Sequence, residues 1–508
     1  MFRSTVATLV LLLNASILLA QLTEFRAGDK LSASEMNKNF QYLEEQFRGA
    51  RKTTVNCGTS GNGSGINEAI DNGYTDITIT GICKENIRAT VWRESTADSN
   101  QPSGKLAPRY LKITGANSSA KIVDATSNTE TLIFVTSGAT LSLMNLTLSG
   151  GQQGVVAARN SNLYLSNVRV ENFTDNGIAV ADSSWLGVDE GGVVVEGNDT
   201  GFGVYLVTGA SGWMYKSNIS NVERGIVVYG GSFLYIRDTD ISDTKIGIRV
   251  DASKLIKYEG TAEINSASDY GIWVTGNSLF KNSSGKLGIN KSDKAAISLD
   301  NSQFLNNEGP LEIERSSNYP IVDIINNSYA DIKSVNLVGS NLDLIRVNNS
   351  STLILRDSTI QNTNQSILNL HQNSHVRLID STLQSSNSRA IYIDTGSSIV
   401  LEGSTVEASS ERTIWVANFS NILVTKQSTV LGNAGPALEI SRGSYGNIGG
   451  NEYNIGNTVK RSEGGTAIQL NYYSNLVIDG QNDVGDINCG NMGSAYNLET
   501  LNEVCNTK

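Results

Sequence analysis

A short motif, Gly or another small residue followed by an aliphatic residue, any residue and Val or Ile, recurs along the chain at nearly constant spacing. It reads GIAV from Gly177, GIRV from Gly247 and GIWV from Gly271. Equivalent positions between Leu132 and Ala437 are mostly 22 to 24 residues apart. A fixed period of this size is the signature of a solenoid, in which each repeat packs only on its neighbours.

A second pattern lies inside each period. Segments such as LYLSNVRV, LILRDSTI and IVLEGSTV alternate apolar and polar residues, reach an Asn, Asp or Gly, and continue into a shorter apolar stretch. Alternation predicts β-strands, and no helical spacing fits into the period, which argues against a leucine-rich repeat. The sequence therefore predicts an all-β solenoid with three short strands per coil. About 15 to 17 coils, each adding about 4.8 Å, would form a rod of roughly 75 Å.

Within the recurring motif, the alternation fixes which residues face the core. Ile248 and Val250 are predicted to point inward and to stack on the equivalent aliphatic residues of neighbouring coils. Gly247 is predicted to supply a turn conformation that a Cβ would disfavour. Arg249, between the two inward residues, must then point outward.

The start of the repeats carries a different signal. In SGINEAIDNG, the residues Ile66, Ala69 and Ile70 share one helical face, and the alternating strand YTDITITG follows. A stack of coils needs its open end covered, because the apolar interior would otherwise meet water. Residues 64 to 72 are therefore expected to form a capping helix.

The four cysteines lie in pairs at the two ends of the repeats. Cys57 and Cys83 flank the first coils, and Cys489 and Cys505 lie at the far end. Pairing within each end would staple the places where a repeat array frays, so this connectivity is favoured over the other two. No CxxC spacing occurs and the chain has only two histidines, so no metal site is expected.

The first twenty residues, MFRSTVATLVLLLNASILLA, have the pattern of a cleaved secretory signal. Arg3 precedes an apolar run centred on Leu9 to Leu13, and Ala20 offers a small residue at the cleavage point. An N-terminal membrane anchor is the alternative. No other segment approaches the roughly 18 apolar residues of a spanning helix, so no membrane span is expected after signal removal. The chain is predicted to be secreted or held at the cell surface.

Residues 21–54 form a separate N-terminal segment before the repeat domain at 55–508. Met36, Phe40, Leu43 and Phe47 lie on one stripe of a predicted short helix. This helix is expected to dock on the main domain, and an oligomerisation seam that would make the protein a homo-oligomer is left open. The sequence FRAGDKLSASEMNKNF also resembles a short leader at the mature N-termini of many bacterial exported and phage-like proteins.

The repeat architecture as a whole resembles the right-handed parallel β-helix superfamily that includes pectate lyases, polygalacturonases and phage tailspikes. The resemblance covers roughly residues 55 to 505 and implies a single-stranded right-handed parallel β-helix. Polygalacturonases of this superfamily carry Gly-His-Asp and Arg-Ile-Lys segments, and pectate lyases carry an Arg-x-Pro-x-x-Arg context. None of the three occurs in this chain. The resemblance therefore implies the fold without supporting a pectinase activity.

One outward row of the repeats is rich in aromatic and charged residues. It contains Arg249 and the residues that follow or precede it by whole coils, and those predicted to bind a ligand are Tyr205, Arg249, Trp273, Arg346, Tyr392 and Trp415. Flat aromatic rings suit sugar rings, and side chains about 4.8 Å apart along a rigid sheet could follow an extended glycan. The alternative is that these aromatics only stack on their neighbours, since aromatic residues favour strands.

A further set of polar residues lies on the same face and could support catalysis. The candidate catalytic residues are Asp323, Asp394 and His371. A glycosidase needs two carboxyl groups roughly 5 to 10 Å apart, and a lyase needs a base beside a neutralised uronate. The alternative is chance, because a long solenoid with 50 acidic residues will bring carboxylates together anyway.

The net charge and the constant coil length limit the classes of function that this chain can have. The net charge of −11 argues against nucleic acid, and it disfavours an anionic polysaccharide unless a local basic row offsets it. The even coil lengths leave little room for loops that would wall a catalytic cleft. The sequence favours a non-enzymatic glycan-binding, adhesive or structural rod whose partner is a polysaccharide or cell-surface glycan. A polysaccharide lyase or glycoside hydrolase is the alternative. No cofactor is expected, and calcium is left open.

Overall fold

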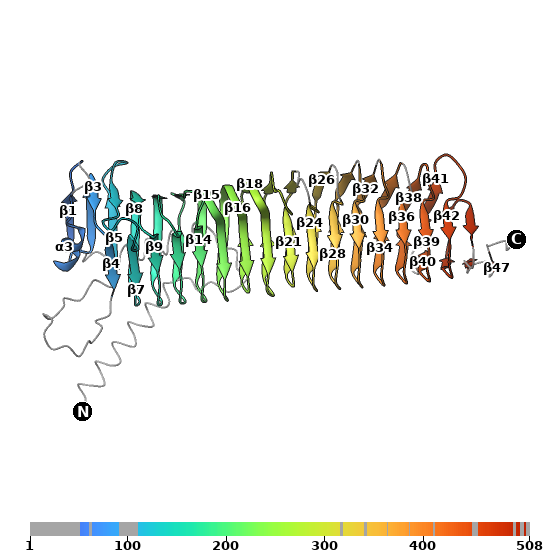
Figure 1. The fold of residues 1–508 in the computed structure, drawn as a ribbon, viewed down its shortest axis with the longest axis horizontal. Helices are drawn as coiled ribbons and strands as arrows, with labels where there is room; N and C mark the ends of the chain where they lie inside the picture. The colour runs from blue at the N-terminus through green and yellow to red at the C-terminus, as the bar shows by residue number, and fades with distance from the viewer. Residues whose placement is uncertain are drawn as a thin grey trace, which may run out of the picture.

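The computed structural model is a right-handed parallel β-solenoid of about 16 turns (Figure 1). It describes residues 51–59, 63–90, 110–314, 319–339, 343–362, 364–385, 387–409, 412–449, 456–490, 494–497 and 502–503. The expected signal peptide at 1–20, the expected helix from Ser34 to Phe47 and Cys505 lie outside the described residues. Three parallel faces run along the rod, and each coil contributes one strand segment to each face.

The three faces are named here by their strands. Face A consists of β4 (Ile87–Thr90), β7 (Ile133–Thr136), β9 (Gln153–Ala157), β11 (Asn176–Val180), β14 (Phe202–Leu206), β15 (Ser211–Tyr229), β16 (Phe233–Asp251), β18 (Ala262–Thr275), β21 (Ile297–Asp300), β24 (Val322–Ile325), β27 (Ile345–Val347), β30 (Leu368–Leu370), β33 (Ile391–Ile393), β36 (Ile414–Val416), β39 (Leu438–Ile440), β42 (Ile468–Leu470) and β45 (Ile487–Cys489). Face B consists of β1 (Lys52–Asn56), β2 (Asp76–Thr80), β5 (Tyr110–Gly115), β8 (Thr140–Ser149), β10 (Asn162–Glu171), β12 (Trp185–Val188), β15, β16, β17 (Lys254–Lys257), β19 (Leu279–Asn282), β22 (Gln303–Asn306), β25 (Tyr329–Lys333), β28 (Thr352–Arg356), β31 (His375–Ile379), β34 (Ser398–Glu402), β37 (Asn421–Thr425), β40 (Tyr445–Ile448), β43 (Asn475–Ile478) and β46 (Ser494–Asn497). Face C consists of β3 (Ile82–Lys84), β6 (Lys121–Val123), β8, β10, β13 (Val193–Glu196), β15, β16, β18, β20 (Leu287–Ile289), β23 (Leu311–Ile313), β26 (Val335–Gly339), β29 (Thr359–Asn362), β32 (Thr382–Ser385), β35 (Thr405–Ala408), β38 (Thr429–Gly432), β41 (Thr458–Arg461) and β44 (Asp483–Val484). A final strand, β47 (Asn502–Glu503), pairs antiparallel with β46.

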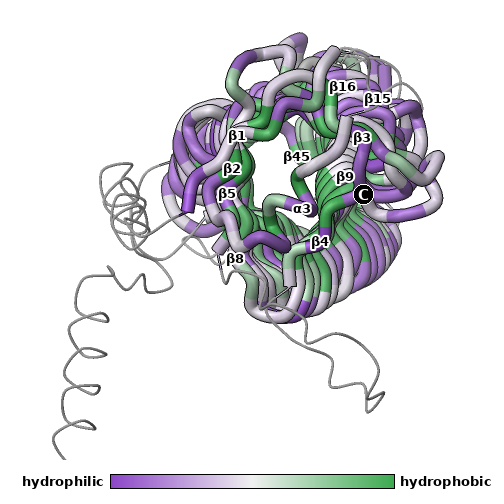
Figure 2. The backbone as a smooth tube through the Cα atoms, turned by 90° about the vertical axis from the view of Figure 1, so that its left-hand side faces the viewer, coloured by the Kyte–Doolittle hydropathy of each residue, from purple (hydrophilic) through white to green (hydrophobic). Residues whose placement is uncertain are grey.

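One continuous cluster of buried, mostly aliphatic residues fills the interior, and hydrophobic residues recur along the inner side of the coils (Figure 2). Ile248 pairs in register with Ile226 on one side and Ile272 on the other, and all three are fully buried. Inward and outward residues alternate along each strand, so the constant period repeats the same inward positions in every coil. The predicted stacking of the recurring motif is confirmed.

The prediction that Gly247 supplies a turn conformation is wrong. Gly247 lies inside β16 with no positive φ, so it does not supply a turn conformation. A Cβ at this position would stand 2.5 Å from Cγ2 of Ile264 and 2.7 Å from the carbonyl oxygen of Gly271. The glycine is needed because the strand bends closely over the core between faces C and A.

The corner that follows each strand of face A has a repeating backbone conformation. In most coils two consecutive residues there adopt positive φ, as Gln372 and Asn373 do at 55° and 61°. Short polar residues and glycine tolerate this left-handed conformation best, which explains the Asn, Asp, Ser and Gly of these positions.

Buried serines form a hydrogen-bonded ladder at another corner, between faces B and C. The backbone N–H of Ser358 donates to Oγ of Ser381, that of Ser381 to Oγ of Ser404, and that of Ser404 to Oγ of Ser428, each at 3.2 Å. Each hydroxyl in turn donates to a carbonyl of its own corner, such as Oγ of Ser381 to Ile379 at 2.8 Å. Every buried polar atom of the ladder is thereby satisfied.

The N-terminal end of the column is closed as expected. The helix α3 (Ile66–Asp71) buries Ile66, Ala69 and Ile70 against the first coil. Cys57 and Cys83 form a disulfide, which confirms the predicted pair. Cys489 is disulfide-bonded as well, and Cys505, the partner expected for it, lies outside the described residues.

The capping helix is held by a carboxylate from a distant position. Gly65 occupies its N-cap and offers no side-chain hydrogen bond. Instead, Oε1 of the buried Glu85 accepts from the N–H groups of Gly65 and Ile66, at 2.9 and 2.7 Å, and Oε2 accepts from the N–H of Asn67 at 3.0 Å. The free donors of the first helical turn are thereby satisfied by a negative charge at the positive end of the helix.

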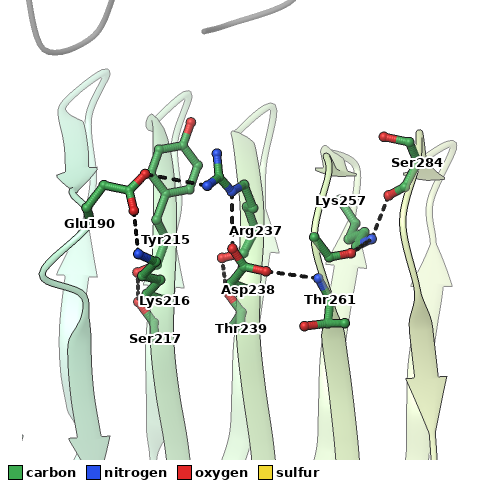
Figure 3. Close-up of polar contacts among 11 residues, drawn as sticks. Glu190, Tyr215, Lys216, Ser217, Arg237, Asp238, Thr239, Lys257, Thr261 and Ser284 are labelled. Atoms are coloured by element: carbon green, nitrogen blue, oxygen red, sulfur yellow. Dashed lines mark hydrogen bonds and ion pairs between the residues drawn. The ribbon is translucent and has the colours of Figure 1, made fainter. Parts of the chain in front are cut away.

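One interior row of face B turns polar in the middle of the rod. Lys257 follows Ile236 in register and is itself followed by Asn282. Its side chain is fully buried, and its Nζ donates to the carbonyl oxygens of Gly260 and Ser284, each at 2.6 Å (Figure 3). Burial lowers the pKa of Lys257 to about 8, because the charged amine loses its hydration.

This buried lysine predicts a pH-dependent stability. The unfolded side chain titrates near 10.4, so between pH 8 and 10 the unfolded chain binds more protons than the folded one, and stability rises with pH. Lys257→Met is expected to remove this contribution, which amounts to about 3 kcal/mol across the whole window. Urea denaturation of both proteins at pH 7.5 to 10.5 measures it. Other titrating groups are common to both, so equal slopes would contradict the prediction.

Candidate functional site

The outward residues of face A lie in one unbroken register. Tyr205 pairs through Val227 with Arg249, and Arg249 pairs with Trp273. The same row continues, in order, through Ser298, Asp323, Arg346, Asn369, Tyr392, Trp415, Glu439 and Gln469. We call this row, from Tyr205 to Gln469, the strip. All six residues predicted to bind a ligand lie on it, one strand spacing or a few spacings apart.

The first half of the strip combines rings with cations. The guanidinium of Arg249 lies 4.6 Å from the ring centroid of Trp273 and also binds Asp251 at 2.7 Å. Tyr270 also stacks on Trp273, with centroids 5.3 Å apart, and Nζ of Lys294 lies 5.3 Å from the centroid of the Tyr270 ring. The faces of both rings are therefore largely occupied by neighbouring side chains.

The second half repeats this arrangement. Tyr392 and Trp415 have ring centroids 4.8 Å apart, and His371 meets Tyr392 edge to face at 5.4 Å. Arg389 lies over Tyr392 at 4.4 Å and over Trp415 at 5.3 Å, while Arg412 lies over Trp415 at 4.6 Å. Sequence reasoning missed both arginines, because they stand before the strands, where the alternation does not fix their direction.

Arg389 differs from the other basic residues of this face. Arg249, Lys294, Arg346 and Arg412 each pair with a carboxylate. Among the described residues, no carboxylate lies within ion-pair distance of the Arg389 guanidinium, whose Nε donates to Oγ of Ser366 at 3.1 Å. Arg389 thus lies on a half-buried aromatic base and forms no ion pair within the part of the chain that the structure describes.

The structure brings His371 and Asp394 together but leaves Asp323, the third candidate catalytic residue, apart from them. Both carboxylate oxygens of Asp323 accept from Arg346, at 2.8 and 2.6 Å. Asp394 lies three coils further on, about 14 Å by strand spacing, and its Oδ2 is 3.6 Å from Nδ1 of His371. Asp394 also accepts hydrogen bonds from Asn418 and from the N–H of Thr395. Asp323 and Asp394 are therefore too far apart for a glycosidase pair.

Two carboxyl groups have a raised pKa, one beside the strip and one on it. Burial raises the pKa of Asp343, although a hydrogen bond from Asn369 and the nearby Arg389 oppose this. Burial likewise raises the pKa of Glu439. The positive charge of Arg412, whose Nε lies 3.0 Å from Oε2 of Glu439, acts in the opposite direction. Asp343 lies at a corner before β27, and no motif or periodicity pointed to it.

A resident metal or cofactor finds few ligands in the described part of the chain. The group of His, Cys, Asp and Glu side chains that comes within metal-ligand distance there is Cys57, Cys83 and Glu85. The two sulfur atoms are bonded to each other and the carboxylate caps α3, so these atoms are already used. No helix within the described ranges is long and apolar enough to cross a membrane.

The comparison with protein families agrees with this architecture. A family model described as the right-handed beta helix region matches residues 131–323 and 320–483, which include the whole strip. No curated protein matches the chain. Because the matched segments cover well over half of the sequence, the chain belongs to the right-handed β-helix family.

Proposed function

We propose that this protein is a non-enzymatic, exported rod that binds an extended glycan along the strip. The observation that carries the proposal is the unbroken register of aromatic and charged side chains from Tyr205 to Gln469. Groups repeated at about one strand spacing on a rigid sheet can meet successive units of a linear polymer. A sheet that is already ordered loses little conformational freedom when it binds.

The contacts suggest how sugars would be recognised. Because Arg249 and Arg389 cover ring faces, a sugar would meet ring edges, guanidinium groups and carboxylates rather than bare aromatic planes. Ion pairs such as Arg346 with Asp323 hold donors and acceptors in fixed positions that hydroxyl groups can bridge. Arg389, which has no carboxylate partner among the described residues, would select a glycan with an acidic substituent at that coil.

The same geometry weighs against catalysis. A general base or nucleophile needs a free carboxylate oxygen near the scissile bond, and both oxygens of Asp323 are held by Arg346. Hydrolysis stays the second candidate because of Asp343, whose raised pKa suits a proton donor. That role would require a partner carboxylate across the bound glycan.

Replacing strip aromatics is expected to weaken glycan binding. The Tyr392→Ala and Trp415→Ala double variant removes the platform under Arg389, and we expect binding to a retained polysaccharide to fall about tenfold or more. Affinity electrophoresis against neutral and acidic polysaccharides, with and without calcium, measures retention. The control is Tyr329→Ala, a half-buried tyrosine on face B. Equal loss in the control would contradict the strip as the binding face.

The enzymatic alternative is tested in the same incubations. The proposal expects no new reducing ends and no unsaturated uronate absorbance over hours. Product that forms with the unaltered chain and disappears in Asp343→Asn would make the protein a depolymerase and overturn the non-enzymatic proposal. Export is tested separately, by asking whether deletion of residues 1–20 keeps the protein inside the producing cell.

A further inference from the structure

The corner after face A changes character near the C-terminal end. Its positive-φ positions hold Asn373 and Gly396 in two central coils, but Phe419 and the pair Tyr472 and Tyr473 in later ones. Their φ angles are 63°, 52° and 61°. Large aromatic residues are rare in the left-handed conformation, because the Cβ approaches the following carbonyl at a cost of roughly 1 to 2 kcal/mol per residue.

Burial does not compensate for this strain. The exposed fractions are 76% for Phe419, 58% for Tyr472 and 67% for Tyr473, and Tyr445 at the start of β40 is 39% exposed. We call these four residues the corner patch. Asparagine or glycine would adopt the left-handed conformation with less strain, as they do in the central coils. Stability of the fold therefore does not explain why aromatic residues stand at these positions.

The four rings lie on three consecutive coils, and Gly443 is at the corner of the middle coil. The N–H of Phe419 donates to the carbonyl oxygen of Arg442 at 3.1 Å, and the N–H of Gly443 donates to that of Tyr472 at 2.9 Å. The Phe419 ring lies across Gly443, where an added Cβ would stand 2.7 Å from Cε1. Phe419 and the two tyrosines therefore flank Gly443 over two strand spacings, about 10 Å.

The size and charge of the patch indicate its occupant. At about 200 Å² for each aromatic side chain, these exposures present roughly 500 Å² of ring surface. A stable protein interface needs about 800 Å² from each partner, which is more than the patch supplies. The other residues of these three corners are Asn418, Arg442 and Gly443, so the corners themselves are polar and carry one charge. Separate aromatic side chains among polar residues can pack against the apolar faces of pyranose rings.

We propose that the corner patch is a second carbohydrate site that binds neutral pyranose units by ring stacking. Unlike the rings of the strip, those of the patch have no arginine lying over them among the described contacts. The patch adjoins the strip, because Nε1 of Trp415 donates to Oγ of Ser441, the residue before Arg442, at 3.0 Å. The inference goes beyond the proposed function, since it concerns different residues and a different sugar class.

The test exploits the backbone strain. In the full chain, the triple variant Phe419→Asn, Tyr472→Asn and Tyr473→Gly places favoured residues at the left-handed positions, so its thermal midpoint should equal or exceed that of the parent. Titration calorimetry with tetrasaccharides of glucose, mannose and N-acetylglucosamine should show binding to the parent that weakens at least tenfold in the variant. Asn373→Gly, at the same corner position of a central coil, is the control and should leave binding unchanged.

Each other outcome overturns the inference. A lower thermal midpoint in the triple variant would mean that the rings stabilise the fold. No binding of any tetrasaccharide to the parent would exclude neutral sugars, and a parent dimer that becomes monomeric in the variant would assign the patch to a second copy of the chain. The strip variant Tyr392→Ala with Trp415→Ala should still bind the tetrasaccharides, so the two sites fail or succeed separately.

Discussion

Gly247→Val is expected to lower the free energy of unfolding by about 3 kcal/mol or more. A Cβ at this position already comes within 2.5 Å of the Ile264 side chain and 2.7 Å of the Gly271 carbonyl oxygen, and valine adds two further methyl groups. Neither neighbour can retreat easily, because Ile264 is buried and Gly271 belongs to the ladder of the next coil. Urea denaturation followed by far-UV circular dichroism measures the loss.

The matched control is Gly288→Ala. Gly288 lies in β20 without a positive φ, and the nearest atom to an added Cβ is Cγ of Glu263 at 3.5 Å, an ordinary contact. This variant should be neutral or slightly more stable, because alanine restricts the unfolded chain. If both variants lose the same stability, close approach over the core is not the reason for the glycine at 247.

Glu85→Ala is expected to cost about 3 kcal/mol and to loosen the N-terminal coil first. The substitution leaves the buried N–H of Ile66 and those of Gly65 and Asn67 without their shared acceptor. Hydrogen exchange should accelerate in residues 52 to 90 before it changes in the central coils, because a solenoid frays from its ends.

Two further variants distinguish the loss of the hydrogen bonds that cap α3 from the loss of a negative charge near the helix. Glu85→Gln keeps one acceptor oxygen and should lose less stability than Glu85→Ala. Glu68→Ala removes an exposed carboxylate from the same helix and should change little. Equal exchange rates in Glu85→Ala and the unaltered chain would contradict the proposed capping role.

The register of the strip could be predicted from the sequence, because it follows from two periodicities alone. A constant coil length places equivalent residues side by side, and the alternation of strands decides which face each takes. Arg249, Trp273 and Trp415 were therefore located correctly without any knowledge of their contacts.

Features outside the strands could not be predicted in this way. Arg389 and Asp343 lie at corners, where a side chain's direction depends on backbone angles that the alternation does not set. The hydrogen bonds from the start of α3 to Glu85 join residues about one coil apart in sequence. They involve backbone N–H groups, which every residue has, so no residue pattern reveals them. The role of Gly247 depends on Ile264 in the neighbouring coil, so it was attributed to the wrong cause.

The hydrogen bonds of the buried serine ladder all run in one direction along the rod. Each serine N–H is satisfied only by the hydroxyl of the following coil, as Ser381 is by Ser404, whereas each hydroxyl finds its carbonyl within its own corner. In a stack of coils that ended at Ser381, the backbone N–H of Ser381 would have no acceptor at the C-terminal edge. The next coil supplies that acceptor, the Oγ of Ser404. A serine at this corner of the next coil therefore matches the donor that the preceding coil leaves at its C-terminal edge.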